Sequence, residues 1–260
     1  MEQGSFTNRT NTRLESDIDL RVQHPLLHIH TPPGVSLTSA MILGDYRDAG
    51  VTYAEVLGRM RDEITSELNR VFGRSNVDAT GGKAIKVSGN EGTRSEVDVV
   101  PTFTLHHIRT AGLAGVTKDD GVALLSPTGH WTFNYPDQHI ANGRAKRLRT
   151  GLKFKRIVRS IKRLQSDMEE HGLLRRRVPS FLIECLVYLV EDYHFLVETD
   201  DRYMRVKRVL QRISERLNSG LATYMLLEIN DIKPLFGGQA WTLEQAQEFV
   251  RLALWHLGDD

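Results

Sequence analysis

The sequence contains a single cysteine among its 260 residues, and this scarcity excludes several classes of protein. One thiol can build neither a disulfide framework nor a cysteine-rich zinc site. Cys185 stands in the apolar run PSFLIECLVYLV, which favours a small core residue over a reactive nucleophile. Stability must therefore come from a hydrophobic core, and a chain of this length can bury a sizeable one.

Long hydrophobic runs are missing as well. No apolar stretch approaches the roughly 18 residues that span a bilayer, and no charged-then-apolar leader is found. We therefore expect a cytoplasmic protein with no membrane partner. The formal net charge of +1 and the apolar fraction of 40% are typical of an ordinary globular protein, with one large domain or two packed lobes.

Two common site patterns are also absent. Gly81-Gly82-Lys83 lacks P-loop spacing, and no Ser or Thr follows its lysine, so we predict a turn or bulge before a strand. His28 with His30, and the pair His106 and His107, lack a third and fourth zinc ligand in the sequence. We predict that these histidines are surface or core residues.

Acidic residues are absent between positions 144 and 163, where ten residues are Lys or Arg. The segment from 184 to 201 is, by contrast, net acidic. A solvated helix face would explain the basic run. A polyanionic ligand, such as a nucleoside triphosphate or a nucleic acid, explains its density equally well.

The first half of the chain is predicted as mixed α/β. Alternating apolar residues predict strands at 14–22, 83–87 and 95–105, and the segment 24–34, rich in Pro and His, reads as a connection. A four-residue apolar period predicts a helix at 52–72. Together these patterns indicate an α+β fold.

The second half is predicted as mainly helical. Helices are expected at 151–172, from Pro179 onward, at 202–217 and at 242–256, the last opened by a capping box. The loop SPTGHWTFNYPDQHIANG, at 126–143, is predicted to separate two lobes, residues 1–130 and 131–260. No internal repeat or low-complexity tract is present.

Three carboxylates form the strongest candidate site. Side chains alternate along a strand, so Asp17 and Asp19 should share a face, and Asp98 should occupy a matching face of a neighbouring strand. Their mutual repulsion is tolerable if divalent cations lie between them, and hard oxygen ligands suit Mg²⁺. Glu96 has the same strand parity as Asp98 and is the alternative third carboxylate.

A glycine-serine pair precedes these carboxylates. Gly4 would let the backbone approach a phosphate, and the Ser5 hydroxyl could donate to its oxygens, with Thr10 bracing the same turn. Each element alone is weak evidence. Gly-Ser, then D-x-D in an apolar strand, then a second strand with a central Asp is a much more specific pattern.

This pattern resembles the bacterial cGAS/DncV-like nucleotidyltransferases, within the DNA polymerase β-like superfamily. The likeness extends over nearly the whole chain, through GSFTNRT…SDIDL, GGKAIKV…EVDVVPTF and YPDQHIANG…FKRIVRSIKRL…VPSFLIECLVY. EINDIKPLF and AWTLEQAQEFV look like the C-terminal helices of the family. The resemblance implies a nucleotidyltransferase core packed on a helical lobe, with a substrate cleft between them.

The resemblance also implies roles for individual residues. Asp17, Asp19 and Asp98 match the ligands of two Mg²⁺ ions, for which Mn²⁺ can substitute, and Gly4 and Ser5 match the phosphate-contacting pair.

In the helical lobe, Lys162 and Ser180 match the triphosphate contacts and Phe181 an aromatic for base stacking. Lys155 is a second choice, expected on nearly the opposite side of its helix. From the sequence alone, Arg159 and Lys162 are three residues apart and can share one anion.

One departure from the family concerns the N-terminus. A long helix usually precedes the Gly-Ser pair, whereas only three residues precede it here. Trp131 and Tyr135 would either stack on a base or pack between the lobes.

The implied activity is attack of a 3′- or 2′-hydroxyl on the α-phosphate of a nucleoside triphosphate, with release of pyrophosphate. The product would be a cyclic or short linear oligonucleotide, a second messenger in anti-phage defence, with an effector or regulatory protein encoded nearby as partner. The alternative is nucleotide transfer to a tRNA or protein acceptor, with nucleic acid bound through the basic run at 144–163. A degenerate, non-enzymatic nucleotide-binding module is a third reading, which the three intact carboxylates disfavour.

Overall fold

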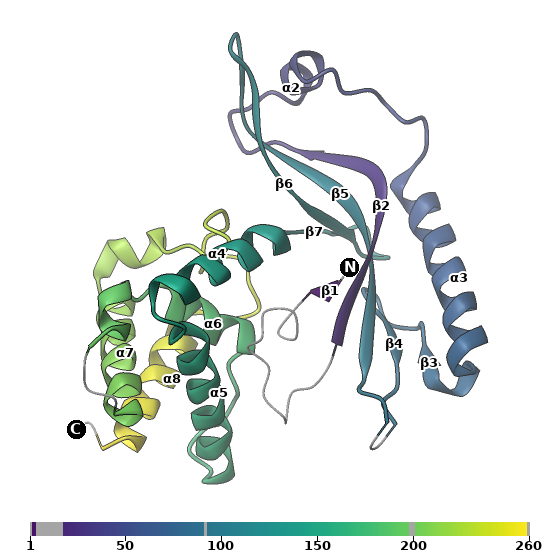
Figure 1. Ribbon diagram of the computed structural model, residues 1–260. Helices are drawn as coiled ribbons and strands as arrows, with labels where there is room; N and C mark the ends of the chain where they lie inside the picture. The colour runs from purple at the N-terminus through teal and green to yellow at the C-terminus, as the bar shows by residue number, and fades with distance from the viewer. Residues whose placement is uncertain (1, 4–17, 91–92, 198–200, 259–260) are drawn as a thin grey trace. The chain divides into compact units, whose positions relative to one another are not determined.

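The computed structural model describes residues 2–3, 18–90, 93–197 and 201–258 (Figure 1). These residues form two compact units, one ending at Pro136 and the other beginning at Asp137. The first combines a sheet with helices and the second is helical, which confirms the predicted α+β class. Within the described ranges, no helix is both long and apolar enough to cross a membrane.

The first unit is built on a seven-stranded sheet in the described part of the chain. Its strands are β1 (Glu2–Gln3), β2 (Ile18–His30), β3 (Val77–Asp78), β4 (Ile85–Val87), β5 (Val97–Gly112), β6 (Gly115–Leu125) and β7 (Trp131–Asn134). The order is β1-β2-β5-β4-β3, and β6 pairs with both β5 and β7. β2 and β5 are parallel, whereas the other pairs are antiparallel.

Strand β2 is longer than the sequence predicted. The segment expected as a connection from His24 onward continues the strand to His30, in spite of Pro25. The register with β5 shifts between His24 and Leu27, so the proline lies at an irregularity where a missing N–H costs no ladder bond. His28 and His30 are consequently strand residues.

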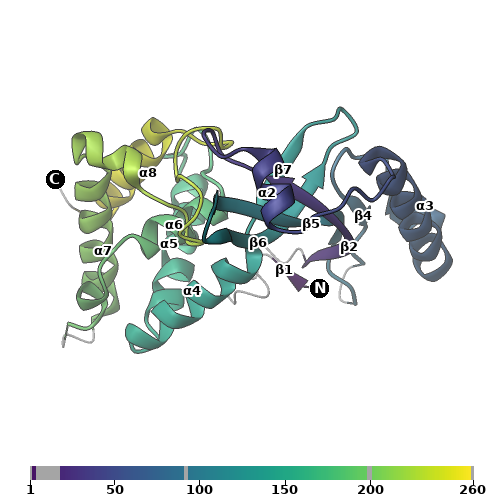
Figure 2. The ribbon, with the colours of Figure 1, turned by 90° about the horizontal axis from the view of Figure 1, so that it is seen from above.

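Helix α3 (Tyr53–Phe72) packs beside β3 and β4 (Figures 1 and 2). It begins with the capping box of Thr52 and Glu55 and buries Val56 and Met60, as the four-residue period predicted. The short helix α2 (Leu37–Leu43) and the 3₁₀ turn η1 (Arg74–Asn76) were not predicted. Gly81 to Lys83 form the turn before β4, in agreement with the sequence.

The second unit contains five α-helices in its described residues. They are α4 (Pro136–Arg149, whose first residue closes the first unit), α5 (Phe154–Glu170), α6 (Ser180–Tyr188), α7 (Arg202–Leu217) and α8 (Leu243–His256), with 3₁₀ turns η2 (Asp192–Phe195) and η3 (Gly220–Met225). Helices α7 and α8 lie side by side in both views (Figures 1 and 2). The capping box at Thr242 opens α8 as predicted.

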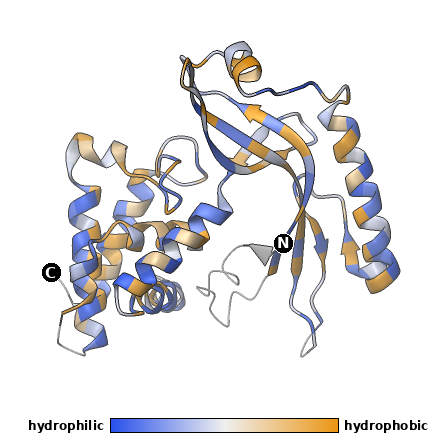
Figure 3. Ribbon diagram, turned by 45° about the horizontal axis from the view of Figure 1, so that its top comes forward, coloured by the Kyte–Doolittle hydropathy of each residue, from blue (hydrophilic) through white to orange (hydrophobic). Residues whose placement is uncertain are grey.

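A hydrophobic core joins α5 to α8. Helix α5 contributes Phe154, Ile157, Val158, Ile161 and Met168 from one face. The alternation of apolar and polar residues along the helices is visible in Figure 3. Cys185 is fully buried in α6, and burial raises the pKa of its thiol well above the ordinary value, which confirms a core residue.

Two segments of this half differ from the predictions. The expected loop at 126–143 holds β7 and the start of α4, so the first unit ends at Pro136, whereas the predicted lobe boundary followed residue 130. EINDIKPLF, expected as a helix, is instead a turn closed by an isolated bridge between Leu227 and Pro234. Asp231 within it has a positive φ of 57°, which a helix does not allow.

Candidate active site

Two of the three predicted carboxylates are neighbours in the sheet. In the parallel ladder of β2 and β5, Asp19 is the register partner of Asp98. On its other side Asp98 pairs with Lys86 of β4. Because directly opposed residues share a face of the sheet, Asp19, Asp98 and Lys86 form one row across three strands.

The remaining candidates from the N-terminal segment lie outside the described residues: Gly4, Ser5, Thr10 and Asp17. The chain approaches them from two described positions. Gln3 of β1 directly precedes Gly4 and is the register partner of Asp19 of β2. Ile18, which directly follows Asp17, donates its N–H to the carbonyl of Glu96 at 3.0 Å. Their predicted roles remain predictions.

The environment of Asp98 fits a cation ligand. Its side chain is 28% exposed, and Lys86 Nζ lies 3.8 Å from Oδ1. That oxygen is covered from solvent and accepts no hydrogen bond from the described residues. A covered carboxylate oxygen without a hydrogen-bond donor, beside a second carboxylate on the adjacent strand, matches the hard oxygen donors that Mg²⁺ prefers.

Glu96, the alternative third carboxylate, has a different environment. It precedes β5, its side chain is 44% exposed, and it pairs with Lys86 Nζ at 3.4 Å. Lys86 is therefore shared between Glu96 and Asp98. The register pair with Asp19 belongs to Asp98, and the geometry favours Asp98 over Glu96.

The second unit holds the other predicted contacts. Lys162 of α5 is 1% exposed, and Ser180 is the first residue of α6. Phe181 is half-buried, and its ring lies 5.3 Å from that of His139 and 5.9 Å from that of Trp241, measured between centroids. All three residues keep their predicted roles as predictions.

The predicted placement of Lys155 is wrong. Lys155 and Lys162 are seven residues apart, close to two helical turns, so at 3.6 residues per turn they differ by roughly 20° around the axis. Both are buried in α5. Lys155 therefore lies on the same side of the helix as Lys162, about two turns nearer the start of α5.

The histidines near β2 are packed within the first unit. The His28 ring stacks on Trp131 with centroids 4.0 Å apart and also contacts Phe133 and Tyr53. Burial, helped by the charge of His30, lowers the pKa of His28 to about 4. His28 and Trp131 thus form part of an aromatic cluster, in which His28 is half-buried.

A cluster of side chains of types that can ligate a metal was missed by sequence reasoning. Asp167, His171 and His256 place one ligand atom each within 4.8 Å of one another. His256 Nε2 lies 2.6 Å from Asp167 Oδ2, and this hydrogen-bond contact joins α5 to the end of α8. The i, i+4 spacing of Asp167 and His171 was visible in the sequence, but nothing local pointed to His256.

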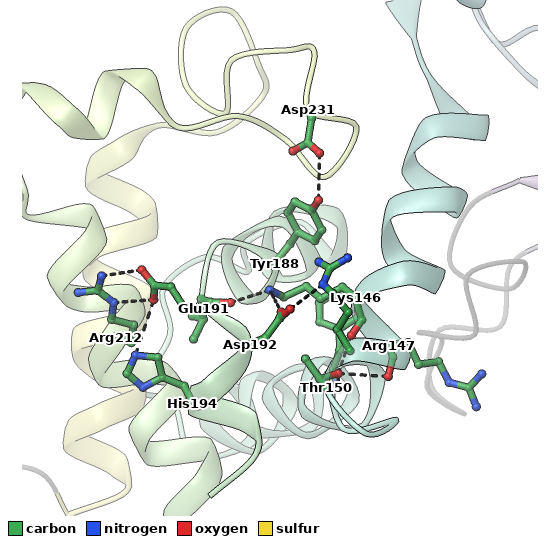
Figure 4. A network of polar contacts seen from close by, with 12 residues as sticks. Lys146, Arg147, Thr150, Tyr188, Glu191, Asp192, His194, Arg212 and Asp231 are labelled. Atoms are coloured by element: carbon green, nitrogen blue, oxygen red, sulfur yellow. Dashed lines mark hydrogen bonds and ion pairs between the residues drawn. The ribbon is translucent and has the colours of Figure 1, made fainter.

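Figure 4 shows how the basic and acidic segments of the second unit are paired. Lys146 of α4 is buried and donates to the carbonyl of Val190 at 2.6 Å and to Asp192 Oδ1 at 3.0 Å. Arg149 donates to the other oxygen of Asp192 at 2.6 Å. Burial alone would raise the pKa of Asp192, but the hydrogen bonds from Arg149 and Lys146 bring it below its ordinary value.

The same acidic segment also reaches α7. Arg212 binds Glu191 through two nitrogens, and these hydrogen bonds hold the pKa of Glu191 at about 2 (Figure 4). The net acidic stretch therefore neutralises part of the basic run by direct contact. Lys146 is buried in this contact, whereas Arg149 pairs with Asp192 at the surface.

Comparison with known proteins gives a consistent result along the chain. Residues 141–258 match the model of the cGAS/DncV-like nucleotidyltransferase C-terminal helical domain. The sequence is 34% identical, over 96% of this chain and 81% of the relative, to a cyclic dipyrimidine nucleotide synthase CdnE from Legionella pneumophila. A protein of the same name from Cecembia lonarensis is 31% identical, over 98% of this chain and 82% of the relative.

A solved structure gives the same relationship in three dimensions. The Rhodothermus marinus CdnE c-UMP-AMP synthase with Apcpp and Upnpp matches with a TM-score of 0.77 and 25% identity. The match covers 98% of this chain and 82% of that chain.

Proposed function

Because this chain belongs to the cGAS/DncV-like nucleotidyltransferase family, we propose that it joins nucleoside triphosphates into a cyclic dinucleotide. One observation carries the proposal. Asp19 and Asp98 are register partners on adjacent strands, in a chain that aligns over 96% of its length with a cyclic dipyrimidine nucleotide synthase.

In this proposal the carboxylates form the reaction centre. Asp19 and Asp98, together with Asp17, would hold two Mg²⁺ ions, for which Mn²⁺ can substitute. When bound, such ions stabilise charge on the attacking and leaving oxygens of an in-line displacement. Lys86 partly offsets the repulsion between the carboxylates from the β4 side.

The other residues position the nucleotide. Gly4 and Ser5 would donate to phosphate oxygens, Lys162 and Ser180 would bind the triphosphate, and Phe181 would stack on a base. The acceptor hydroxyl oxygen forms the new bond to the α-phosphorus, the bond to pyrophosphate breaks, and the hydroxyl proton passes to solvent. A second such transfer closes the ring. Rate acceleration would come from alignment of the reacting groups and from charge stabilisation.

We further propose that the enzyme accepts pyrimidine nucleotides. The support is similarity: the relatives from Legionella and Cecembia, both above 30% identity, carry the name cyclic dipyrimidine nucleotide synthase. The neighbour from Rhodothermus is described as a c-UMP-AMP synthase and was solved with a uridine nucleotide analogue. UTP is therefore expected among the incorporated substrates.

The test is to incubate the purified protein with all four nucleoside triphosphates and Mg²⁺ or Mn²⁺, and to identify products by mass spectrometry. A cyclic dinucleotide containing uridine is expected. Asp98→Asn and Asp19→Asn should lower turnover by at least about 100-fold. Asp62→Asn, the same change at an exposed position of α3, should leave turnover unchanged.

Two results would contradict the proposal. Full Mg²⁺-dependent pyrophosphate release by Asp98→Asn would remove that residue from the reaction centre. Label from an α-³²P nucleotide found only in tRNA or protein, with no small product, would favour the macromolecular-acceptor alternative.

The biological role that we propose follows the family resemblance. The product would act as a second messenger in anti-phage defence, in the cytoplasm, through an effector or regulatory protein encoded nearby. Plaque counts on a host carrying the wild-type operon, compared with the Asp98→Asn operon, would test this role. Equal plaque counts would contradict it.

A further inference from the structure

A basic pocket lies in the second unit, on the outer side of α5. It is a hollow of about 500 Å³ in the described structure. Its lining residues are Lys153, Arg156, Ile157, Arg159 and Arg163 from the α5 segment, and Arg202 and Arg205 from α7. Six of these seven residues are cationic, and no described carboxylate lines it.

The sequence builds the pocket through helical spacing. Arg156, Arg159 and Arg163 follow one another at three and four residues, so they share a face of α5. The core face of the same helix is formed by Phe154, Val158 and Ile161. The arginine face therefore points away from the core.

Helix α7 closes the pocket from the other side. Arg202 and Arg205 lie in its first turn, and Arg205 is 7% exposed. Both Nε and Nη2 of Arg202 donate to the Ser160 hydroxyl of α5, at 3.1 Å and 2.9 Å. This link fixes the first turn of α7 against α5. Asp201, which directly precedes α7, is its N-cap and accepts a hydrogen bond from the N–H of Tyr203 at 2.8 Å.

Clustered cations repel one another, and the effect is seen in the pKa of Arg159. Burial, followed by the charges of Arg163, Arg156, Arg202 and Arg147, lowers the pKa of Arg159. An anion in the hollow would remove that repulsion. Guanidinium groups are suited to phosphate because their planar N–H forks bind two phosphate oxygens at once.

We propose that this pocket is a binding site for a multiply phosphorylated small anion, such as a free polyphosphate or the polyphosphate of a nucleotide. A concave hollow of about 500 Å³ is within the size range of small-molecule sites, whereas single-stranded nucleic acid is usually bound along an extended groove. Neither Lys162 nor Ser180, the residues proposed for the substrate triphosphate, lines the pocket. Arg159, whose spacing alone would let it share an anion with Lys162, does line it, so in this proposal Arg159 belongs to this second site and not to the substrate triphosphate.

The test is direct binding of inorganic tripolyphosphate to the full chain by calorimetry, at fixed salt and with EDTA present. Tripolyphosphate carries no nucleoside to transfer, so the outcome does not depend on the proposed activity. Arg156→Gln and Arg163→Gln, both at exposed positions, should each weaken binding by at least about 10-fold, the effect of losing one charge-assisted phosphate contact. Arg251→Gln, the same change at an exposed position of α8, should have no effect.

Further variants and ligands distinguish this pocket from other sites that could bind tripolyphosphate. Lys162→Gln should retain tripolyphosphate binding, and loss of binding in this variant alone would place the probe in the substrate site and overturn the proposal. No binding at millimolar tripolyphosphate, or equal weakening by Arg251→Gln, would also overturn it. A single-stranded RNA that binds through Arg156 and is not displaced by tripolyphosphate would overturn the small-anion assignment.

Discussion

Lys146 is the residue through which the packing of the second unit can be tested most sharply. Its side chain is 5% exposed, and its ammonium is surrounded by the Val190 carbonyl, the Asp192 carboxylate and the rings of Tyr188 and Phe195. Burial lowers the pKa of Lys146, and the hydrogen bond with Asp192 opposes this effect. The lysine is thus a buried cation that its partners compensate.

Replacing Lys146 by Met keeps the aliphatic stem and removes the charge. The carbonyl of Val190 loses its donor, which costs about 1–3 kcal/mol for a buried group. Asp192 keeps Arg149 and is 30% exposed, so the full penalty of roughly 3–5 kcal/mol for breaking a buried pair does not apply. We expect a loss of about 2 kcal/mol in the free energy of unfolding.

The assay uses the single cysteine. Cys185 is fully buried in the core of the second unit, so its alkylation across a urea gradient reports the opening of that unit. Asp192→Asn and the double variant complete a cycle, and their coupling energy should be at least about 1 kcal/mol. Arg149→Gln is the control, because the Arg149 side chain is 55% exposed and its pair should contribute about 1 kcal/mol or less. Additive effects of Lys146→Met and Asp192→Asn would refute the reasoning.

Two further predictions concern pH and helix capping. Because the pKa of His28 falls from 6.5 to about 4 on folding, acidification through this window protonates the unfolded chain first, and stability should decrease by at most about 3 kcal/mol. His28→Phe should flatten the change in urea midpoint between pH 7 and pH 5, and an unchanged slope would contradict the assignment. Thr242→Ala removes the capping box of α8 and should cost about 1 kcal/mol, measured by Cys185 alkylation in urea. No change in that midpoint would show that tertiary packing alone holds the helix end.

The sequence predicted those features that local patterns determine. The helix from Tyr53 to Phe72 and the capping box at Thr242 follow from short-range spacing, whereas the capping box of Thr52 and Glu55 was not predicted. The alternation around Asp98 placed this residue on a strand, and the register with Asp19 agrees with that placement. The family resemblance supplied the long-range arrangement that spacing could not.

The misses have physical causes outside the local pattern. Pro25 suggested a break, but a register irregularity in β2 accommodates it, and such irregularities depend on the partner strand. β6 continues the sheet from β5 through a turn at Gly112 to Gly115. The segment Trp131–Asn134, predicted as a loop, is strand β7 because it pairs with β6. The basic run illustrates the same limit, since only tertiary contacts decide that Lys146 is buried and Arg156 lines a pocket.

The parallel pairing of β2 with β5 also determines when Asp19 and Asp98 come together in a newly made chain. Asp19 and Asp98 are 79 positions apart in the chain, and closing a loop of that length costs roughly 4 kcal/mol of chain entropy before any contact is gained. Such a non-local pairing forms slowly compared with helices. A growing or cleaved chain that ends before residue 97 has one half of the carboxylate pair and no partner strand. If the pair serves the proposed reaction, a fragment that ends before β5 should therefore be inactive.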